Sequence, residues 1–216
     1  MTKERLTMAA PNVREYAHNL AYNLAREQLA GLDDIEKQCL RSGTEYRPTE
    51  KAVIISYLNQ PYRLSLPDGE VSGMAGGEVP LRDKILILHY FTRAKGTPLS
   101  NKMITYQELV EGINYYPTFF KRAIKPIVNH FGSEPEQLLK TAEILGGYQA
   151  DYGDVAVTIH AFSRVPVTPV LWKGDKEFAP EGNIMFDSTI PDYLPTEDIT
   201  ILSEVIAWRL VRLLKS

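Results

Sequence analysis

Apolar residues recur along the chain with two different spacings, and these spacings predict its helices and strands. A spacing of three and four residues begins at Asn12 and predicts an amphipathic helix that ends near Gly31. Two more helices are predicted over 80–94, where almost no polar face is left, and over 196–214. We expect the helix over 80–94 to be the most buried one. We also expect the apolar face of the first helix to pack in the core, and that face consists of Val13, Tyr16, Ala17, Leu20, Ala21 and Leu24.

A period of two predicts strands in other parts of the chain. These strands are centred near Val53, Tyr62, Val155, Val170 and Ile184. The expected fold is therefore α+β, a mainly antiparallel sheet of about five strands packed on one side by the helices that begin near 12, 80 and 196. No linker divides the chain, so we expect a single domain over 1–216. Residues 1–11 carry no periodic pattern and are expected to fray.

Two further stretches have a specific local signal. A helix that starts at Pro117 must be kinked or divided at Pro126, because proline removes a backbone bond and clashes with the preceding turn. Residues 168–187 are typical of a strand, a structured loop and a second strand. In that loop we expect Trp172 to be at least half buried and Gly174 to adopt a conformation closed to other residues. Asp175 and Glu177 would then share one concavity.

Composition excludes several classes of protein. Hydrophobic residues make up 44% of the chain and charged residues 24%, with a formal net charge of -3, which gives no general attraction to nucleic acid or anionic membranes. The single cysteine, Cys39, excludes an intramolecular disulfide and a multi-cysteine zinc or iron–sulfur site built from this chain alone. No apolar run has the length of a signal or a membrane-spanning helix, so we expect a cytoplasmic protein.

Charge is distributed unevenly, and this is the most informative feature. Residues 82–131, the basic segment, contain eight Lys or Arg against three acids, together with eight of the 21 aromatic residues. Aromatic rings beside cationic donors suit an anionic, partly planar ligand, such as a nucleotide, a pterin or a tetrapyrrole. They would equally suit single-stranded nucleic acid. The alternative is that the rings are core and the bases form a solvated helix face. The candidate cofactor-binding residues are Arg93, Lys95, Tyr106, Tyr115, Tyr116, Arg122 and Lys125, with Trp172, Asp175 and Glu177 from the loop.

Geometry must decide between these alternatives. If the basic segment forms a pocket, at least two of its candidate cations, Arg93, Lys95, Arg122 and Lys125, should converge on one cleft. Tyr106, Tyr115 or Tyr116 should form the walls of that cleft.

Motifs for catalysis are missing from the sequence. It contains no nucleophile elbow, zinc-protease helix, phosphate-binding lysine loop or dinucleotide fingerprint. His160 and Asp175 are the only weak candidates for an acid/base site, and an ordinary strand histidine is the competing interpretation. The acids Asp175, Glu177 and Asp187 match no EF-hand spacing, so no metal site is expected.

Several blocks of sequence resemble a family of uncharacterised proteins from anaerobic bacteria and archaea that is described as a domain of unknown function. The blocks are Leu86 to Tyr90, Ala94 to Leu99, Tyr116 to Arg122, Leu171 to Phe178 and Phe186 through Ile199. Some relatives are joined to a cysteine-rich iron–sulfur segment like that of corrinoid one-carbon proteins, which implies a redox or methyl-transfer setting. This chain lacks those cysteines, and it has Lys176 and Glu177 where the family has a pair of acids.

Together these observations favour a non-catalytic, cytoplasmic binding or accessory protein. Its expected ligand is an anionic, partly planar cofactor, with a corrinoid as one candidate, in anaerobic one-carbon or redox metabolism. One alternative is an enzyme with an acid/base site at His160 and Asp175. Another is a docking subunit that uses the basic segment to bind an acidic or iron–sulfur/corrinoid protein. Nucleic acid and membranes are not expected partners.

Overall fold

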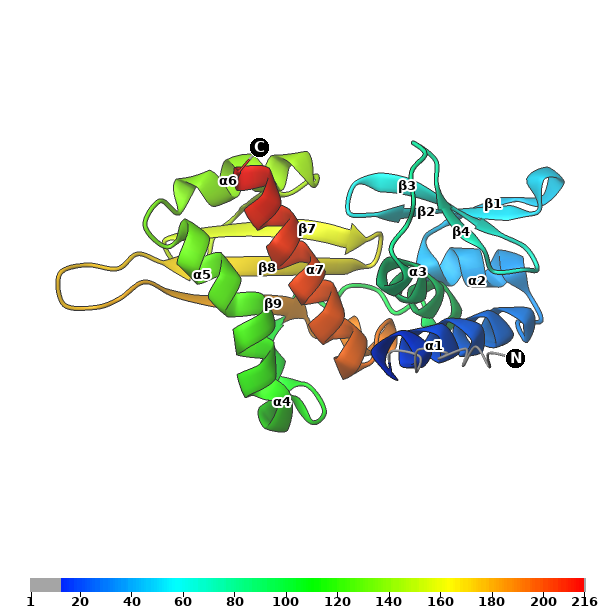
Figure 1. Cartoon of the computed structure of the whole chain (residues 1–216), viewed down its shortest axis with the longest axis horizontal. Helices are drawn as coiled ribbons and strands as arrows, with labels where there is room; N and C mark the ends of the chain where they lie inside the picture. Colours follow the sequence, from blue (N-terminus) through cyan, green and yellow to red (C-terminus); the bar gives the residue numbers. More distant parts are fainter. Residues whose placement is uncertain (1–12, 216) are drawn as a thin grey trace, which may run out of the picture.

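The computed structural model describes residues 13–215 and has the α+β fold that the sequence predicts (Figure 1). Within this part of the chain the strands form two antiparallel sheets, of four and five strands, and not one sheet. The predicted fraying of residues 1–11 lies outside the described residues. None of the helices described is long and apolar enough to cross a membrane.

The first sheet is a meander in which each strand pairs with the next one in the sequence. Its strands are β1 (Glu45–Arg47), β2 (Ala52–Tyr57), β3 (Gln60–Ser65) and β4 (Val71–Gly73). Leu58 and Asn59 join β2 to β3, and both have positive φ, as a tight two-residue hairpin requires. The helices on this side of the molecule are α1 (Val13–Ala30), α2 (Ile35–Ser42) and α3 (Leu81–Arg93) (Figure 1).

The second sheet has the order β5-β9-β8-β7-β6. Its strands are β5 (Met103–Thr105), β6 (Tyr148–Ala150), β7 (Val155–Phe162), β8 (Val165–Trp172) and β9 (Glu181–Asp187). The strand, loop and strand predicted over 168–187 are confirmed as β8, β9 and the loop between them. Helices α5 (Lys125–Phe131) and α7 (Thr196–Leu214) cross one face of this sheet, with α6 (Glu136–Ile144) beside them (Figure 1).

One hydrophobic core extends through both halves of the molecule. In α3, Leu86, Ile87 and Leu88 are fully buried, as predicted for this helix, and α7 is buried over much of its length. The Tyr90 ring of α3 stacks on the Phe162 ring of β7, with 4.1 Å between ring centroids. Because the core residues are continuous, the two sheets are parts of one domain.

The face of α1 that packs in the core differs from the face that the sequence predicts. Ala25 and Leu29 are buried, whereas Tyr16, Leu20 and Leu24 are 63%, 49% and 49% exposed. Both stripes are apolar, so hydrophobic spacing alone does not choose between them. Ala25 and Leu29 form the buried stripe, and Tyr22 packs against the core beside them.

The helix predicted to begin at Pro117 begins earlier, at Gly112, so Pro117 lies inside it. The helical stretch consists of three segments. Helix α4 (Gly112–Phe119) continues into a π-helical turn, η3 (Phe120–Ile124), and then into α5. Pro126 lies at the start of α5, where its missing N–H is tolerated. The wider π turn lies directly before it and replaces the α-helical bonds that the proline ring would disturb.

Candidate ligand-binding site

A short loop before α4 brings several of the predicted aromatic residues together. The loop follows β5 and a 3-10 turn, η2 (Tyr106–Glu108), and Glu111 at its end adopts a left-handed conformation with φ of 60°. Non-glycine residues rarely adopt this conformation outside functional or tightly constrained sites. At the next position, Gly112, a Cβ atom would lie only 2.0 Å from the carbonyl oxygen of Tyr106. The close approach of α4 to η2 therefore requires glycine.

The amino end of α7 lies against the same loop. Pro195 precedes the helix and no side chain caps its first turn. Thr196 donates a hydrogen bond from Oγ1 to the carbonyl oxygen of Val110, at 2.9 Å. This bond fixes the first turn of a 19-residue helix, with its positive dipole end, beside Glu111.

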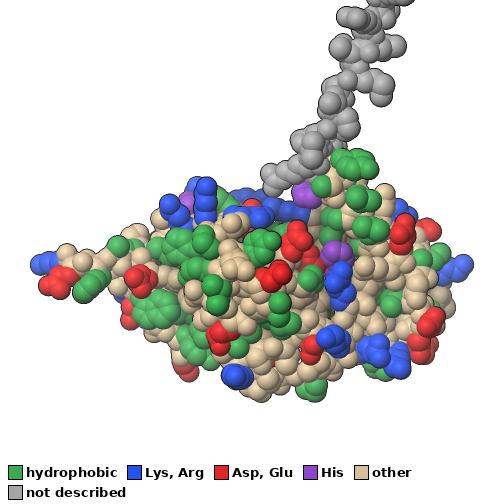
Figure 2. Space-filling view, turned by 90° about the horizontal axis from the view of Figure 1, so that it is seen from below, with side chains coloured by type: hydrophobic (Ala, Val, Ile, Leu, Met, Phe, Trp, Pro, Cys, Tyr) green, Lys and Arg blue, Asp and Glu red, His purple; other side chains and the backbone are tan. Residues whose placement is uncertain are grey.

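A cavity of about 490 Å³ lies between α1, the η2–α4 loop and α7. It lies on the side of the molecule seen in Figure 2, where hydrophobic side chains gather over α4 and acidic side chains lie beside them. The lining residues are His18, Tyr106, Glu111, Tyr115, Thr118, Arg122, Thr196, Glu197, Thr200 and Ile201. Of the residues that the sequence singles out, the cavity unites Tyr106, Tyr115 and Arg122.

Tyr106 forms a rigid part of the cavity wall. Its hydroxyl group lies 2.7 Å from Oγ1 of Thr200, and its ring stacks on Phe119 with a centroid separation of 3.9 Å and an interplanar angle of 9°. The residue is 1% exposed, and burial raises the pKa of its phenol above the ordinary value. The phenol therefore stays neutral and serves as a hydrogen-bonding and packing group.

Arg122 is held in place by an acid of α7. Its Nε and Nη2 atoms lie 2.8 Å and 2.5 Å from Oε2 of Glu204. This pair orients the guanidinium group at the cavity wall and offsets part of its charge. With Glu111 and Glu197 also in the lining, the site offers both a cationic donor and carboxylate acceptors.

Exposed apolar side chains belong to the same loop and helix as the lining residues. Val110, Ile113 and Tyr115 are 78%, 71% and 56% exposed. Apolar groups concentrated beside a cavity are typical of surfaces that bind a ligand or a partner. Tyr115, which belongs to both sets, presents a ring face on which a planar molecule can stack.

The remaining candidates of the basic segment do not line this cavity. Lys95 pairs with Asp192, at 2.8 Å between Nζ and Oδ1. Arg93 and Lys125 are exposed on other surfaces, and Tyr116 is half-buried against the core. The sequence predicts that at least two of the four candidate cations converge on one cleft. This prediction is wrong for the cavity, because only Arg122 of the four lines it.

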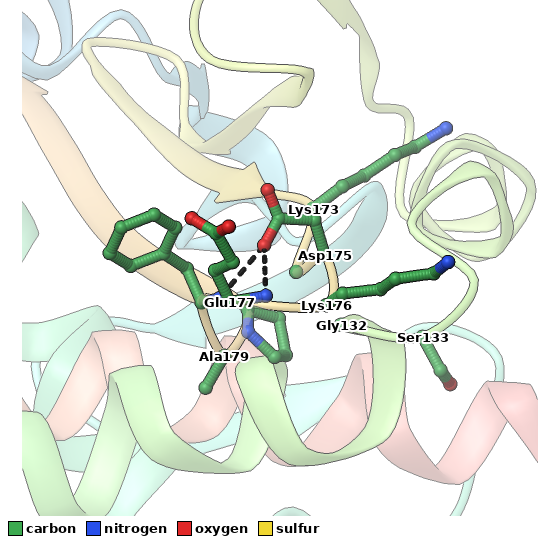
Figure 3. A pocket seen from close by; sticks show the side chains of 10 residues that line it. Gly132, Ser133, Lys173, Asp175, Lys176, Glu177 and Ala179 are labelled. Atoms are coloured by element: carbon green, nitrogen blue, oxygen red, sulfur yellow. Dashed lines mark hydrogen bonds between the residues drawn. The ribbon is translucent and has the colours of Figure 1, made fainter.

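The candidates from the β8–β9 loop form a separate, shallow site at the projecting tip of the hairpin (Figure 1). Asp175 accepts hydrogen bonds from the backbone N–H groups of Glu177 and Phe178, at 2.7 Å and 2.8 Å, and these lower the pKa of its carboxyl group. Figure 3 shows the carboxylates of Asp175 and Glu177 on the same side of the loop. Trp172 is 41% exposed, so it is more than half buried as predicted.

Gly174 is required for a different reason from the predicted one. Its φ does not lie in the left-handed region, but a Cβ atom would stand 2.7 Å from the nitrogen and Cδ of Pro180. The constraint is a lack of space and not a special backbone conformation.

His160 and Asp175 are too far apart to form an acid/base pair. His160 lies opposite Pro166 on β8, whereas Asp175 follows Trp172 at the other end of that strand. The six residue steps from Pro166 to Trp172 alone span about 20 Å. The ring of His160 lies near the hydroxyl group of Tyr148, at 3.4 Å, and burial lowers its pKa.

No group of three or more potential metal ligands comes together within residues 13–215. Asp187, at the end of β9, is 2% exposed and accepts hydrogen bonds from Ser100, Asn101 and Thr189. Its carboxylate therefore anchors the chain that enters β5.

His89 lies on α3 and is partly buried. Its Nδ1 atom lies 2.7 Å from Oδ2 of Asp198, in the first turn of α7. The pair joins α3 to the helix end that borders the cavity.

The comparisons with known proteins give one match. A family described as a domain of unknown function, DUF3786, matches residues 34–209. The chain belongs to the DUF3786 family. Neither a curated protein nor a solved structure matches it significantly. The DUF3786 match covers every lining residue of the cavity except His18, which lies on α1.

Proposed function

We propose that this DUF3786 protein binds a small, anionic and partly planar molecule in the cavity between α1, α4 and α7. The observation that carries the proposal is the convergence of Tyr115, Arg122 and the uncapped first turn of α7 on one enclosed space. Each of these elements recognises a different part of such a ligand.

The three elements have complementary chemistry. The ring of Tyr115 supplies a stacking surface for a planar group. The N–H groups and dipole of α7 favour an acid group, and Arg122 adds charge-assisted donors. Glu111 and Glu197 accept hydrogen bonds, so they match amino groups on the ligand. A planar heterocycle that carries both amino and acid groups, as nucleotides and pterins do, satisfies all of these contacts.

The lining also favours binding over catalysis. Thr196 and Thr200 use their hydroxyl groups in hydrogen bonds to backbone carbonyl groups, and Tyr106 is bonded to Thr200. Among the lining residues described, no hydroxyl group or thiol is paired with a base that would activate it. The proposed role is therefore that of a binding or accessory protein.

The size of the cavity bears on the choice of ligand. Small-molecule pockets enclose about 300–1,000 Å³, and this one lies in the lower half of that range. A nucleotide or pterin is of suitable size, whereas a whole corrinoid would project from the cavity. The link to corrinoids and anaerobic one-carbon metabolism comes from the sequence resemblance. The residues that line the cavity do not add to it.

A thermal-shift screen tests the proposal. Nucleotides, folates, tetrapyrroles and corrinoids would each be added to the full chain. A ligand at one hundred times its dissociation constant stabilises the fold by about 2.7 kcal/mol, which raises the melting temperature of a protein of this size by roughly 5–10 °C. We expect such a shift from a nucleotide or a pterin. If no compound moves the melting curve, the proposal is wrong.

A further inference from the structure

The basic residues in and directly after the π-helical turn η3 lie on two faces with different surroundings. Arg122 points toward α7 and pairs with Glu204, while Ala123 and Ile124 are buried. Lys121 and Lys125 are exposed, and no ion pair within residues 13–215 involves either of them. The π turn therefore separates the cation at the cavity from two cations that face solvent.

The two lysines belong to a continuous exposed ridge. Pro117, Lys121, Lys125 and Asn129 follow one another at intervals of four residues along α4, η3 and α5, and all four are exposed. Side chains four residues apart in a helix lie on the same face. Figure 2 shows Lys and Arg side chains gathered along the edge of the molecule next to the hydrophobic side chains over α4.

Aromatic side chains lie beside this ridge. Phe120 is 39% exposed, and its ring lies 6.2 Å from the ring of Tyr116 at an angle of 48°. A partly exposed Phe120 beside a half-buried Tyr116, next to cations that have no ion pair, combines the apolar anchor and the charge that protein interfaces use. We name Tyr116, Phe120, Lys121 and Lys125 the α4–α5 face.

We propose that the α4–α5 face docks an acidic, amphipathic segment of a partner protein. Apolar side chains of the segment would cover Tyr116 and Phe120, and its carboxylates would pair with Lys121 and Lys125. The proposal goes beyond ligand binding, because this face is formed by residues that do not line the cavity. Two cations match a short acidic segment, whereas tracking a nucleic acid backbone requires a longer basic groove.

The size of the face sets the expected strength of binding. A ridge over 117–129 is about 20 Å long at 1.5 Å per residue, which places it among small, transient interfaces. Both cations are exposed, so binding should weaken as salt concentration rises.

The test uses a synthetic helical peptide of about 15 residues with Leu and Phe on one face and Glu on the other, added to the isotope-labelled full chain. Backbone amide spectra report where it binds. We expect shifts confined to residues around 116–125. We also expect at least tenfold weaker binding to the Lys121→Glu, Lys125→Glu variant. A matched control, Lys140→Glu with Lys176→Glu, reverses two other exposed lysines and should bind as the natural chain does.

Three results would overturn the proposal. The first is binding of the peptide at another surface, or equal binding by the charge-reversed variant. The second is equal binding of a counterpart peptide with Lys in place of Glu, since this would show that charge plays no part. The third is another occupant of the α4–α5 face. This would be shown by tighter binding of a single-stranded oligonucleotide to that face, or by burial of the face in a dimer that sedimentation detects. Melting curves of both variants confirm that they are folded.

Discussion

Gly112 shows how one residue without a side chain shapes the candidate site. Because its Cα faces the carbonyl oxygen of Tyr106, replacement by alanine would force α4 away from η2. We expect Gly112→Ala to destabilise the fold by about 1–3 kcal/mol in urea unfolding, the usual cost of an overpacked position. Gly31→Ala is the matched control, since its nearest contacts would be at an ordinary 3.6 Å. Equal effects of the two substitutions would contradict the geometry described for the loop.

Asp187 makes a pH-dependent contribution to stability. Burial by itself would raise the pKa of this carboxyl group, but hydrogen bonds from Ser100 and Thr189 outweigh it and the folded-state pKa is lowered. A lowered carboxyl pKa stabilises the fold above the unfolded pKa near 4, and the stabilisation is lost as pH falls through the folded pKa.

Asp187→Asn should therefore cost roughly 1.5–3 kcal/mol at pH 7, the range for hydrogen bonds to a charged group, and less at acid pH. Unfolding free energies measured from pH 7 down to pH 2 test this. A cost that stays constant over the whole range would show that the charge of Asp187 is not what matters.

At the residue scale, sequence reasoning finds the site only in part. Tyr106, Tyr115 and Arg122 are identified from their local density of rings and charge. Glu111 and Glu197 are missed because they come together only when the loop before α4 meets the start of α7. The contact that joins these two segments, between Val110 and Thr196, links residues 86 positions apart in the sequence. The sequence predicts where α7 begins, but it does not say which residues lie opposite that helix end.

At the scale of elements, α1 is the clearest departure from expectation. Leu29 is 2% exposed and Leu20 is 49% exposed, although the predicted core face contains Leu20. Leu29→Ala should cost about 2–5 kcal/mol, and Leu20→Ala should change stability by no more than about 0.5 kcal/mol. Urea unfolding of the two variants decides between the faces. The reverse order of costs would mean that Leu20 packs in the core.

Helix and strand positions are well predicted because they depend on local spacing. All five expected strands exist, and the helical stretch over 112–131 is divided just before Pro126. Their division between two sheets is not predicted, because pairing joins residues far apart in the sequence, such as Ile104 and Phe186. Short strands such as β4 and β6, with three residues each, carry too little alternation to detect.

At the scale of the whole molecule, the uneven charge has more than one structural use. The basic segment does not form one cluster: Arg122 borders the cavity, Lys95 pairs with Asp192, and Lys121 and Lys125 face solvent. A count of charges along the sequence shows the excess of Lys and Arg in the basic segment. It does not show which surface each side chain faces, because neighbouring helix residues point to different sides.

Calorimetric titration of a ligand found in the thermal-shift screen measures whether that ligand binds in the cavity between α1, α4 and α7. The titration would compare the natural chain with Tyr115→Ala and Arg122→Gln, which alter the cavity, and with Arg93→Gln and Lys125→Gln, which do not. We predict that each cavity variant loses roughly tenfold or more in affinity, since a charge-assisted bond or a stacked ring contributes on the order of 1.5 kcal/mol. The two control variants should bind within about twofold of the natural chain. Loss of binding in the controls, with the cavity variants unaffected, would contradict the account and place the ligand elsewhere on the basic segment.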